Sequence, residues 1–455
     1  MKKYFLQTFG CQQNLSDSER IDAFLKDKFQ KTALMKEADL IIFNTCSIKQ
    51  HAEDRVFGLL QNAQKIQKKQ GSILAVTGCM IRQTSTSNSL PSDKDNLLKK
   101  ISYLNFVFRI EDTPKLLDLI KICYQNEKII NKNNYCFSKI GQNLAEFFAI
   151  IPHRKNNFSA LVPIMTGCNK FCTYCIVPYS RGREQSRSFQ AIKKECQQLA
   201  NEKVKEILLI GQNVNAFYLN DADRKKRNSQ TDFAFLLDEI AKIKGIERIR
   251  FTSPHPSQLS SDVLEVMAKH KNICQHLHLP VQSGSNKILK KMNRSHSIEE
   301  FKNITKLARQ KMPNIAISTD IIVGFPGESE ADFKQTKDLC QKEKFDIIYI
   351  SKFSSRRGTV AFDMKDDVSL KEKKNRFAII EAELKKSSFY QNKKWLHKKV
   401  KVLVEKFDTN KKIATGKTEQ FKIVHFKTQQ NLIGEIVEVK ITQAEIYFLL
   451  AELIY

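Results

Sequence analysis

Residues 159–184 have the sequence SALVPIMTGCNKFCTYCIVPYSRGRE, in which Cys168, Cys172 and Cys175 fall within eight residues. The apolar run before them predicts a β-strand, so the cysteines belong to the loop at its carboxyl end. A structural zinc site normally has four protein ligands, and no fourth cysteine follows here. The spacing Cys-x3-Cys-x2-Cys suits a [4Fe–4S] cluster with three thiolate ligands and one iron open to a small molecule. Zinc with one non-cysteine ligand is the alternative.

Five further apolar segments follow this strand, and amphipathic helical patterns separate them. They are residues 204–214, 248–256, 274–284, 316–328 and 345–355. Six alternating strand and helix units predict an α/β fold, a partial (β/α)6 barrel of the TIM type over residues 154–388. Because active sites of such barrels lie at the carboxyl ends of the strands, the cysteine loop is expected at the functional mouth.

The first part of the chain repeats one pattern, an apolar β-rich run that ends in a cysteine. The runs end at Cys11, Cys46 and Cys79, and polar helical patterns follow them. This alternation predicts a parallel α/β domain over residues 1–125. Since the loops after parallel strands share one edge of the sheet, we expect the three thiols to converge. Three separately buried thiols are the alternative.

The last segment, residues 389–455, alternates apolar and polar residues between turn signals. This pattern predicts a small antiparallel β-barrel, and residues 126–153 are interpreted as a linker with an edge hairpin. The formal net charge of +27 suits a polyanionic partner, although solvated lysines explain it as well. No apolar run is long enough for a membrane-spanning helix and no signal peptide is recognisable, so we expect a cytoplasmic protein with no membrane partner.

Polar residues that follow the predicted barrel strands are candidates for ligand contacts. Gln212 and Asn213 come directly after the second strand, where the alternative is a capping role before the next helix. Gln282 and Ser283 occupy the same level of the barrel, and the glycine after them permits a close backbone approach. His276 and His278 alternate on one strand and share a face, for which barrel packing or hydrogen bonding is favoured over metal binding.

Basic residues near the cysteine loop are candidates for RNA contacts. Arg181, Arg183 and Arg187 follow the loop, where they suit phosphate groups, although a solvated charge run is the alternative. Lys417 is the corresponding candidate in the basic C-terminal barrel.

The cysteine spacing is the signature of the radical S-adenosylmethionine (SAM) superfamily, and further motifs narrow this resemblance. TFGCQQN at residues 8–14, NTCS at 44–47 and CNKFCTYCIVPY at 168–179 resemble the MiaB-like tRNA methylthiotransferases. The resemblance covers nearly the whole chain, and the C-terminal barrel is similar to a TRAM domain.

The resemblance implies two [4Fe–4S] clusters and SAM as cofactors. One cluster, which cleaves SAM to a radical, would be held by Cys168, Cys172 and Cys175. An auxiliary cluster would be held by Cys11, Cys46 and Cys79. Gln212, Asn213, Gln282 and Ser283 are the candidates for SAM contacts, and no catalytic residue is expected beyond the cluster ligands.

The resemblance also implies an activity, that of a transferase of sulfur-containing groups. The family adds a methylthio group to carbon 2 of isopentenyl-adenosine beside the tRNA anticodon. Expected partners are the anticodon loop and an electron donor such as a flavodoxin or ferredoxin, with a monomer or weak oligomer. The alternatives are a methylthiotransferase acting on threonylcarbamoyl-adenosine or on an aspartate of a ribosomal protein, and a non-catalytic, zinc-dependent RNA-binding protein.

Overall fold

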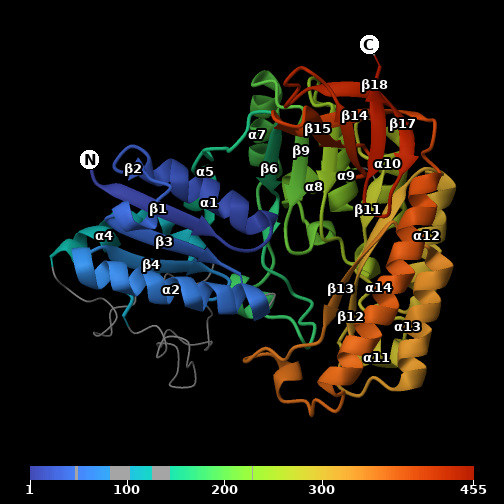
Figure 1. Ribbon diagram of the computed structural model, residues 1–455, viewed down its shortest axis with the longest axis horizontal. Helices are drawn as coiled ribbons and strands as arrows, with labels where there is room; N and C mark the ends of the chain where they lie inside the picture. The colour runs from blue at the N-terminus through green and yellow to red at the C-terminus, as the bar shows by residue number, and fades with distance from the viewer. Residues whose placement is uncertain (47–49, 82–102, 126–143, 228, 455) are drawn as a thin grey trace.

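The protein has three parts in chain order, an N-terminal α/β domain, a central partial barrel and a C-terminal closed barrel (Figure 1). The computed structural model describes residues 1–46, 50–81, 103–125, 144–227 and 229–454, with the backbone alone for 50–54. In the part of the chain so described, no helix has both the length and the apolar character needed to cross a membrane.

The N-terminal domain is built on a five-stranded sheet of order β2-β1-β3-β4-β5, in which every pair is parallel. Its strands are β1 (Lys3–Thr8), β2 (Gln30–Lys31), β3 (Leu40–Thr45), β4 (Ile73–Gly78) and β5 (Phe106–Val107). Every residue of β3 and β4 is buried, as expected for parallel strands covered on both faces. One face packs on α1 (Gln12–Leu25) and α4 (Leu116–Tyr124), the other on α2 (Gln50–Gln70). The predicted parallel α/β domain is confirmed.

The central domain contains six strands in two parallel three-stranded sheets, of order β10-β9-β6 and β11-β12-β13. A parallel bridge between Ile249 and Ile273 joins the two sheets. No pairing connects β6 to β13 among the described strands, so this barrel is partial, as predicted. The strands are β6 (Ser159–Pro163), β9 (Glu206–Ile210), β10 (Arg248–Phe251), β11 (His276–His278), β12 (Ala316–Val323) and β13 (Ile347–Lys352).

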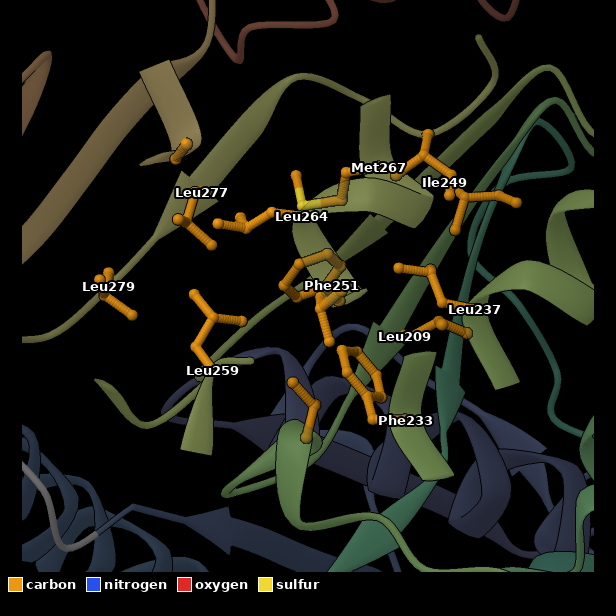
Figure 2. Close-up of a cluster of buried hydrophobic side chains, with 14 of the residues drawn as sticks. Leu209, Phe233, Leu237, Ile249, Phe251, Leu259, Leu264, Met267, Leu277 and Leu279 are labelled. Carbon is orange, nitrogen blue, oxygen red and sulfur yellow. The ribbon is translucent and has the colours of Figure 1, made fainter. Parts of the chain in front are cut away.

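Amphipathic helices surround the partial barrel and bury its outer face. They are α7 (Phe189–Asn201), α9 (Asp232–Ala241), α10 (Ser261–Lys269), α12 (Ile298–Lys311), α13 (Glu330–Glu343) and α14 (Leu370–Lys393). Figure 2 shows part of this core, where Leu209 and Phe251 of the strands lie near Phe233 and Leu237 of α9. Each fully buried side chain of this size contributes about 1.5–3 kcal/mol, so this layer fixes the strand ends that carry the site.

The C-terminal domain is a closed barrel of order β14-β15-β16-β18-β17. Its strands are β14 (Lys399–Asp408), β15 (Ile413–Lys417), β16 (Ile423–Lys427), β17 (Ile436–Ala444) and β18 (Leu449–Leu453). The barrel was expected to be antiparallel throughout, but β16 and β18 pair in parallel. The pairs of strands that are neighbours in sequence, β14–β15, β15–β16 and β17–β18, are antiparallel. The parallel pair β16–β18 joins two strands that are separated in sequence by β17.

Two predicted boundaries differ from the structure. Helix α14 continues to Lys393, so the C-terminal barrel begins after residue 393 instead of at 389. Of the predicted linker and hairpin at 126–153, residues 126–143 lie outside the described residues. The described remainder contains a helix, α5 (Leu144–Ala149), where a hairpin was expected. Phe147 of α5 is buried against the N-terminal sheet, and this tertiary packing accounts for the helix.

Two arginines of β10 hold the C-terminal barrel against the central one. Arg248 donates to the carbonyl oxygens of Lys417 and Lys401 at 2.7 and 2.8 Å. Arg250 donates to the carbonyl oxygens of Thr418 and Glu419 at 2.7 and 2.8 Å. Both arginines are buried, so these hydrogen bonds to charged groups fix the two barrels relative to each other.

We expect Gly284→Ala to destabilise the protein by about 1–3 kcal/mol, because overpacking a core costs that much. A Cβ at Gly284 would lie 2.5 Å from both the Gln335 carbonyl oxygen and the Thr336 Cα of α13. Gly58 of α2 is the matched control, since a Cβ there meets no atom within 4 Å. Gly58→Ala should stabilise by about 0.5–1 kcal/mol. Chemical denaturation of both variants measures the difference, and equal effects would contradict the packing argument.

Candidate metal centres and adjoining cavities

Three cysteines lie at one edge of the N-terminal sheet, where β1, β3 and β4 end. Cys11 begins α1 after β1, Cys46 follows β3 directly and Cys79 follows β4 directly. Gly10 has a φ of +125°, and a Cβ there would lie 2.7 Å from the Cβ of Cys46. Glycine at this position therefore allows the Cys11 loop to approach Cys46.

An interlocked pair of asparagines supports this first triad. Asn14 donates from Nδ2 to Asn44 Oδ1 and to the Thr45 carbonyl, both at 3.0 Å. Asn44 donates from Nδ2 to the Asn14 carbonyl at 2.8 Å and to Ser18 Oγ at 2.9 Å. Both side chains are fully buried. We did not single out these asparagines in the sequence, although they lie inside the TFGCQQN and NTCS segments.

The second triad occupies the loop after β6, at the mouth of the partial barrel as predicted. The Cys168 N–H donates to the Gly182 carbonyl at 3.1 Å, and the Cys175 N–H donates to the Cys172 carbonyl at 2.9 Å. Asn293, after helix α11 (Asn286–Lys291), donates to two carbonyl oxygens of the loop, those of residues 170 and 171. The loop conformation is therefore fixed from both sides.

Within each triad, neighbouring cysteines disfavour one another's thiolate form. Burial, with a contribution from the neighbouring Cys172, raises the pKa of Cys168 to about 11 and that of Cys175 to about 12. Burial also raises the pKa of Cys11, with a further contribution from Cys79. Metal ligands must be deprotonated, so metal binding at these sites releases protons.

Two arginines, one for each triad, contact a cysteine sulfur. Arg181 donates from Nε to Cys79 Sγ at 3.5 Å and from Nη2 to Asp17 Oδ2 at 2.6 Å. Arg294 donates from Nη1 to Cys172 Sγ at 3.7 Å. Arg181 follows the second triad in sequence yet contacts the first, so it joins the two loops.

The placement of two predicted RNA-contact arginines argues against that role. The side chain of Arg181 is only 8% exposed and is occupied by Asp17. Arg187 is similarly buried, with Glu195 at 2.7 Å and the Pro163 carbonyl at 2.7 Å. Arg183 is exposed and lies over the Phe171 ring, so it stays a prediction. Lys417 also stays a prediction, and its ammonium pairs with Glu405 at 2.9 Å.

Two cavities adjoin the triads. The first, of about 340 Å³, is lined by Cys11 and Gln12 of the N-terminal domain, by residues of the central strands and by Phe421 of the C-terminal barrel. The second, of about 480 Å³, is lined by Cys175 and reaches along β13 to α14. Val177 and Tyr349 line both cavities, so the two adjoin each other.

The predicted SAM-contact residues do not all lie in one cavity. Gln212 lines the first cavity and accepts a hydrogen bond from the Gly167 N–H at 2.7 Å. Gln282 lines the second cavity. Asn213 is buried and donates to Glu184 Oε1 at 3.1 Å, which links it to the cysteine loop.

Ser283 faces away from both cavities. It is fully buried, and its hydroxyl lies 3.3 Å from the Thr336 hydroxyl of α13. This placement argues for a packing role and against a SAM contact. The close backbone approach expected at Gly284 is made to α13 and not to a ligand. The Gly284 N–H donates to Thr336 Oγ1 of that helix at 2.9 Å.

The donor set of both triads fits iron–sulfur clusters. The six cysteines are free thiols, and thiolates are the usual ligands of such clusters. Within the described residues, no three His, Cys, Asp or Glu side chains are placed to hold one metal ion. That result concerns single ions, whereas each thiolate of a cluster binds a different iron. The buried polar atoms without a hydrogen-bond partner among the described residues include Gln13 Oε1, beside the cavity that Cys11 lines, and Arg294 Nε, of the arginine that contacts Cys172.

Comparison with known proteins agrees with this architecture. Residues 162–340 match the radical SAM superfamily, residues 3–98 match the uncharacterized protein family UPF0004, and residues 394–454 match the TRAM domain. The radical SAM methyltransferase TsrM from Kitasatospora setae, solved with cobalamin and a [4Fe–4S] cluster, has a similar fold. Its TM-score is 0.54 at 11% identity, over 80% of this chain and 77% of that one. The fold and the cysteine loop thus define a radical SAM protein.

Two curated relatives identify the family within this class. The tRNA-2-methylthio-N(6)-dimethylallyladenosine synthase of Acetivibrio thermocellus is 40% identical over 98% of this chain and 90% of its own length. The protein of that name in Clostridium tetani is 40% identical over 97% of this chain and 94% of its own. The chain belongs to the tRNA-2-methylthio-N(6)-dimethylallyladenosine synthase family.

Asn44→Ala should weaken iron binding at the first triad selectively. Removing this side chain leaves the buried Asn14 amide without one acceptor, which costs about 1–3 kcal/mol and loosens the Cys11 loop. With four irons per cluster, we expect the iron content after anaerobic reconstitution to fall from about eight toward about four. Asn410→Ala, at an exposed position, is the control and should retain full loading. Full loading of Asn44→Ala would show that the asparagine pair does not support the triad.

Proposed function

We propose that this protein transfers a methylthio group to carbon 2 of N6-dimethylallyladenosine beside the anticodon of tRNA. The observation that carries the proposal is the pairing of two cysteine triads, joined by Arg181 and each bordering one of two adjoining cavities. The names of the relatives support the same substrate. The net charge of +27 suits an RNA partner.

In this proposal the larger cavity takes SAM. It borders Cys175 of the second triad, and its lining carries both signs of charge, with Asp320 on β12 and Lys352 at the end of β13. Such a lining suits the amino and carboxylate groups of a methionyl moiety. Of the predicted SAM-contact residues, Gln282 lines this cavity. Cys172 is buried, which restricts water at that sulfur.

The smaller cavity takes the adenosine. It borders Cys11 of the first triad, and in this proposal Gln212, which was predicted as a SAM contact, contacts the bound base instead. The shared wall of Val177 and Tyr349 keeps the two ligands adjacent without merging their sites. A base reaches such a cavity only when it leaves the helical stack, as adenosines of a single-stranded loop can.

The proposal assigns a [4Fe–4S] cluster to each triad, and when bound these groups supply one-electron cleavage of SAM and a site for the transferred sulfur. The chain's own residues hold and orient the ligands. Arg294 and Arg181 place N–H donors against a sulfur of each triad, and hydrogen bonds to sulfur tune the reduction potential of such clusters. An electron donor such as a flavodoxin or ferredoxin and a cytoplasmic location complete the proposal.

Two cysteine substitutions should separate the roles of the triads. Cys168→Ala should abolish SAM cleavage because it removes a ligand of the second triad. Cys46→Ala should leave SAM cleavage and stop sulfur insertion. Cys123→Ala, a half-buried cysteine in neither triad, is the control and should retain both steps. Chromatographic assay of 5′-deoxyadenosine and of methylthiolated nucleoside measures them, and product formation by Cys46→Ala would exclude the first triad from sulfur transfer.

The substrate is tested by nucleoside mass spectrometry of tRNA from cells with and without the gene. We expect 2-methylthio-N6-dimethylallyladenosine to disappear and N6-dimethylallyladenosine to accumulate in the deleted strain. Loss of methylthiolated threonylcarbamoyl-adenosine instead would support that alternative substrate. A colourless protein that contains zinc and no iron would support the RNA-binding alternative.

A further inference from the structure

The first cavity has an unusual floor, because an aromatic side chain of the C-terminal barrel reaches into the central barrel to form it. Phe421 lies in the turn between β15 and β16, and its ring stacks on His276 of β11 with centroids 4.8 Å apart and planes 15° apart. Both side chains line the cavity. The floor is therefore a flat aromatic surface supplied by two domains.

The contacts around Phe421 fix its ring from several directions. The Arg250 guanidinium lies 5.2 Å from the ring centroid, and the Lys417 ammonium lies 4.7 Å from it. Arg250 also donates to the Thr418 carbonyl, which anchors the turn that carries the ring. The His276 ring is held in turn by Ser318 Oγ, 3.1 Å from Nε2.

The backbone of Phe421 is strained in a way that points to a role for its side chain. Its φ of 62° lies in the left-handed region, which glycine and asparagine adopt easily and a bulky residue does not. A turn alone would be better served by either of those residues. Strain of this kind is found where a side chain is held for a function.

The apolar part of the first cavity lies beside this floor. Leu208 and Ile210 of β9 line it together with Phe421. Cys11 and Gln12 of the N-terminal domain also line this cavity. The proposed substrate also has two distinct parts: the sulfur is added at carbon 2, and the apolar five-carbon group is attached at N6. The substituents at these two positions point in different directions from the purine ring. A base whose carbon 2 faces Cys11 therefore directs its N6 group away from Cys11.

We propose that Phe421, with Leu208, forms the binding site for the dimethylallyl group, so that the C-terminal barrel determines substrate specificity as well as holding RNA. The proposal rests on the proposed function and adds a specificity-determining residue to it. An apolar pocket discriminates by the apolar surface it buries, and one methylene alone changes discrimination by about 10-fold or more. Loss of the Phe421 ring should therefore reduce the preference for prenylated RNA roughly tenfold.

The test compares the binding of two anticodon stem-loop RNAs, identical except that one carries the dimethylallyl group on the adenosine beside the anticodon. Binding to cluster-loaded protein without SAM is measured by fluorescence anisotropy. We expect Phe421→Asn to lower the affinity for the prenylated RNA roughly tenfold and to leave the affinity for the plain RNA unchanged. Asparagine tolerates the left-handed backbone, so this variant should fold, and thermal unfolding checks this.

Two further variants sharpen the test. Phe421→Leu keeps an apolar floor and should retain most of the preference. Tyr447→Ala removes an exposed aromatic of the same barrel and should not change the preference. The proposal is overturned if Phe421→Asn keeps the full preference, or if it weakens both RNAs equally, since that result would indicate general RNA binding. Methylthiolation of the prenylated RNA by the unaltered enzyme reports separately on the proposed function, so the two failures are distinguishable.

Discussion

The arrangement of the two triads depends on one buried arginine. Arg181 belongs to the segment that continues the second cysteine loop, and its guanidinium bonds Asp17 of α1 and the Cys79 sulfur. Burial lowers the pKa of Arg181, but Asp17 and Cys79 raise it more, so its pKa stays above the usual range. A buried ion pair adds little net stability compared with a well-packed apolar pair, whereas removing one partner leaves an uncompensated charge. Its value here is geometric, because it fixes the distance between two loops from separate domains.

The three domains make different contributions to one site. The N-terminal sheet presents Cys11, Cys46 and Cys79 because the carboxyl ends of its parallel strands meet at one edge. The central strands provide the walls of both cavities. The C-terminal barrel is fixed by Arg248 and Arg250 and extends one aromatic residue into the first cavity. The smaller cavity is thus incomplete in any one domain, and its shape depends on how the three are docked.

The sequence was sufficient for the parts of this structure that follow from local pattern. The strand periodicity predicted the parallel N-terminal sheet and the partial barrel, and the position of each cysteine after a strand predicted the edge where it lies, since parallel topology leaves little choice of edge. It was insufficient where a side chain's role depends on a distant partner. Arg181 and Arg187 look like a solvated basic run, yet Asp17 and Glu195 bury them. Ser283 follows a barrel strand, but α13 packs so closely there that its hydroxyl faces Thr336. Phe421 carries no motif, because only the docking of two barrels brings it to His276.

The way the C-terminal barrel is attached has a consequence for how this family can diversify. Arg248 and Arg250 form four hydrogen bonds to main-chain oxygens of the barrel. Side chains add to the joint, since Arg250 lies over the Phe421 ring and Lys422 pairs with Asp346. Every amino acid offers the same carbonyl, so these four hydrogen bonds tolerate replacement of the residues that supply the oxygens, provided the backbone path is kept. The outer surface of the barrel can thereby change its charge while these hydrogen bonds beneath it stay intact.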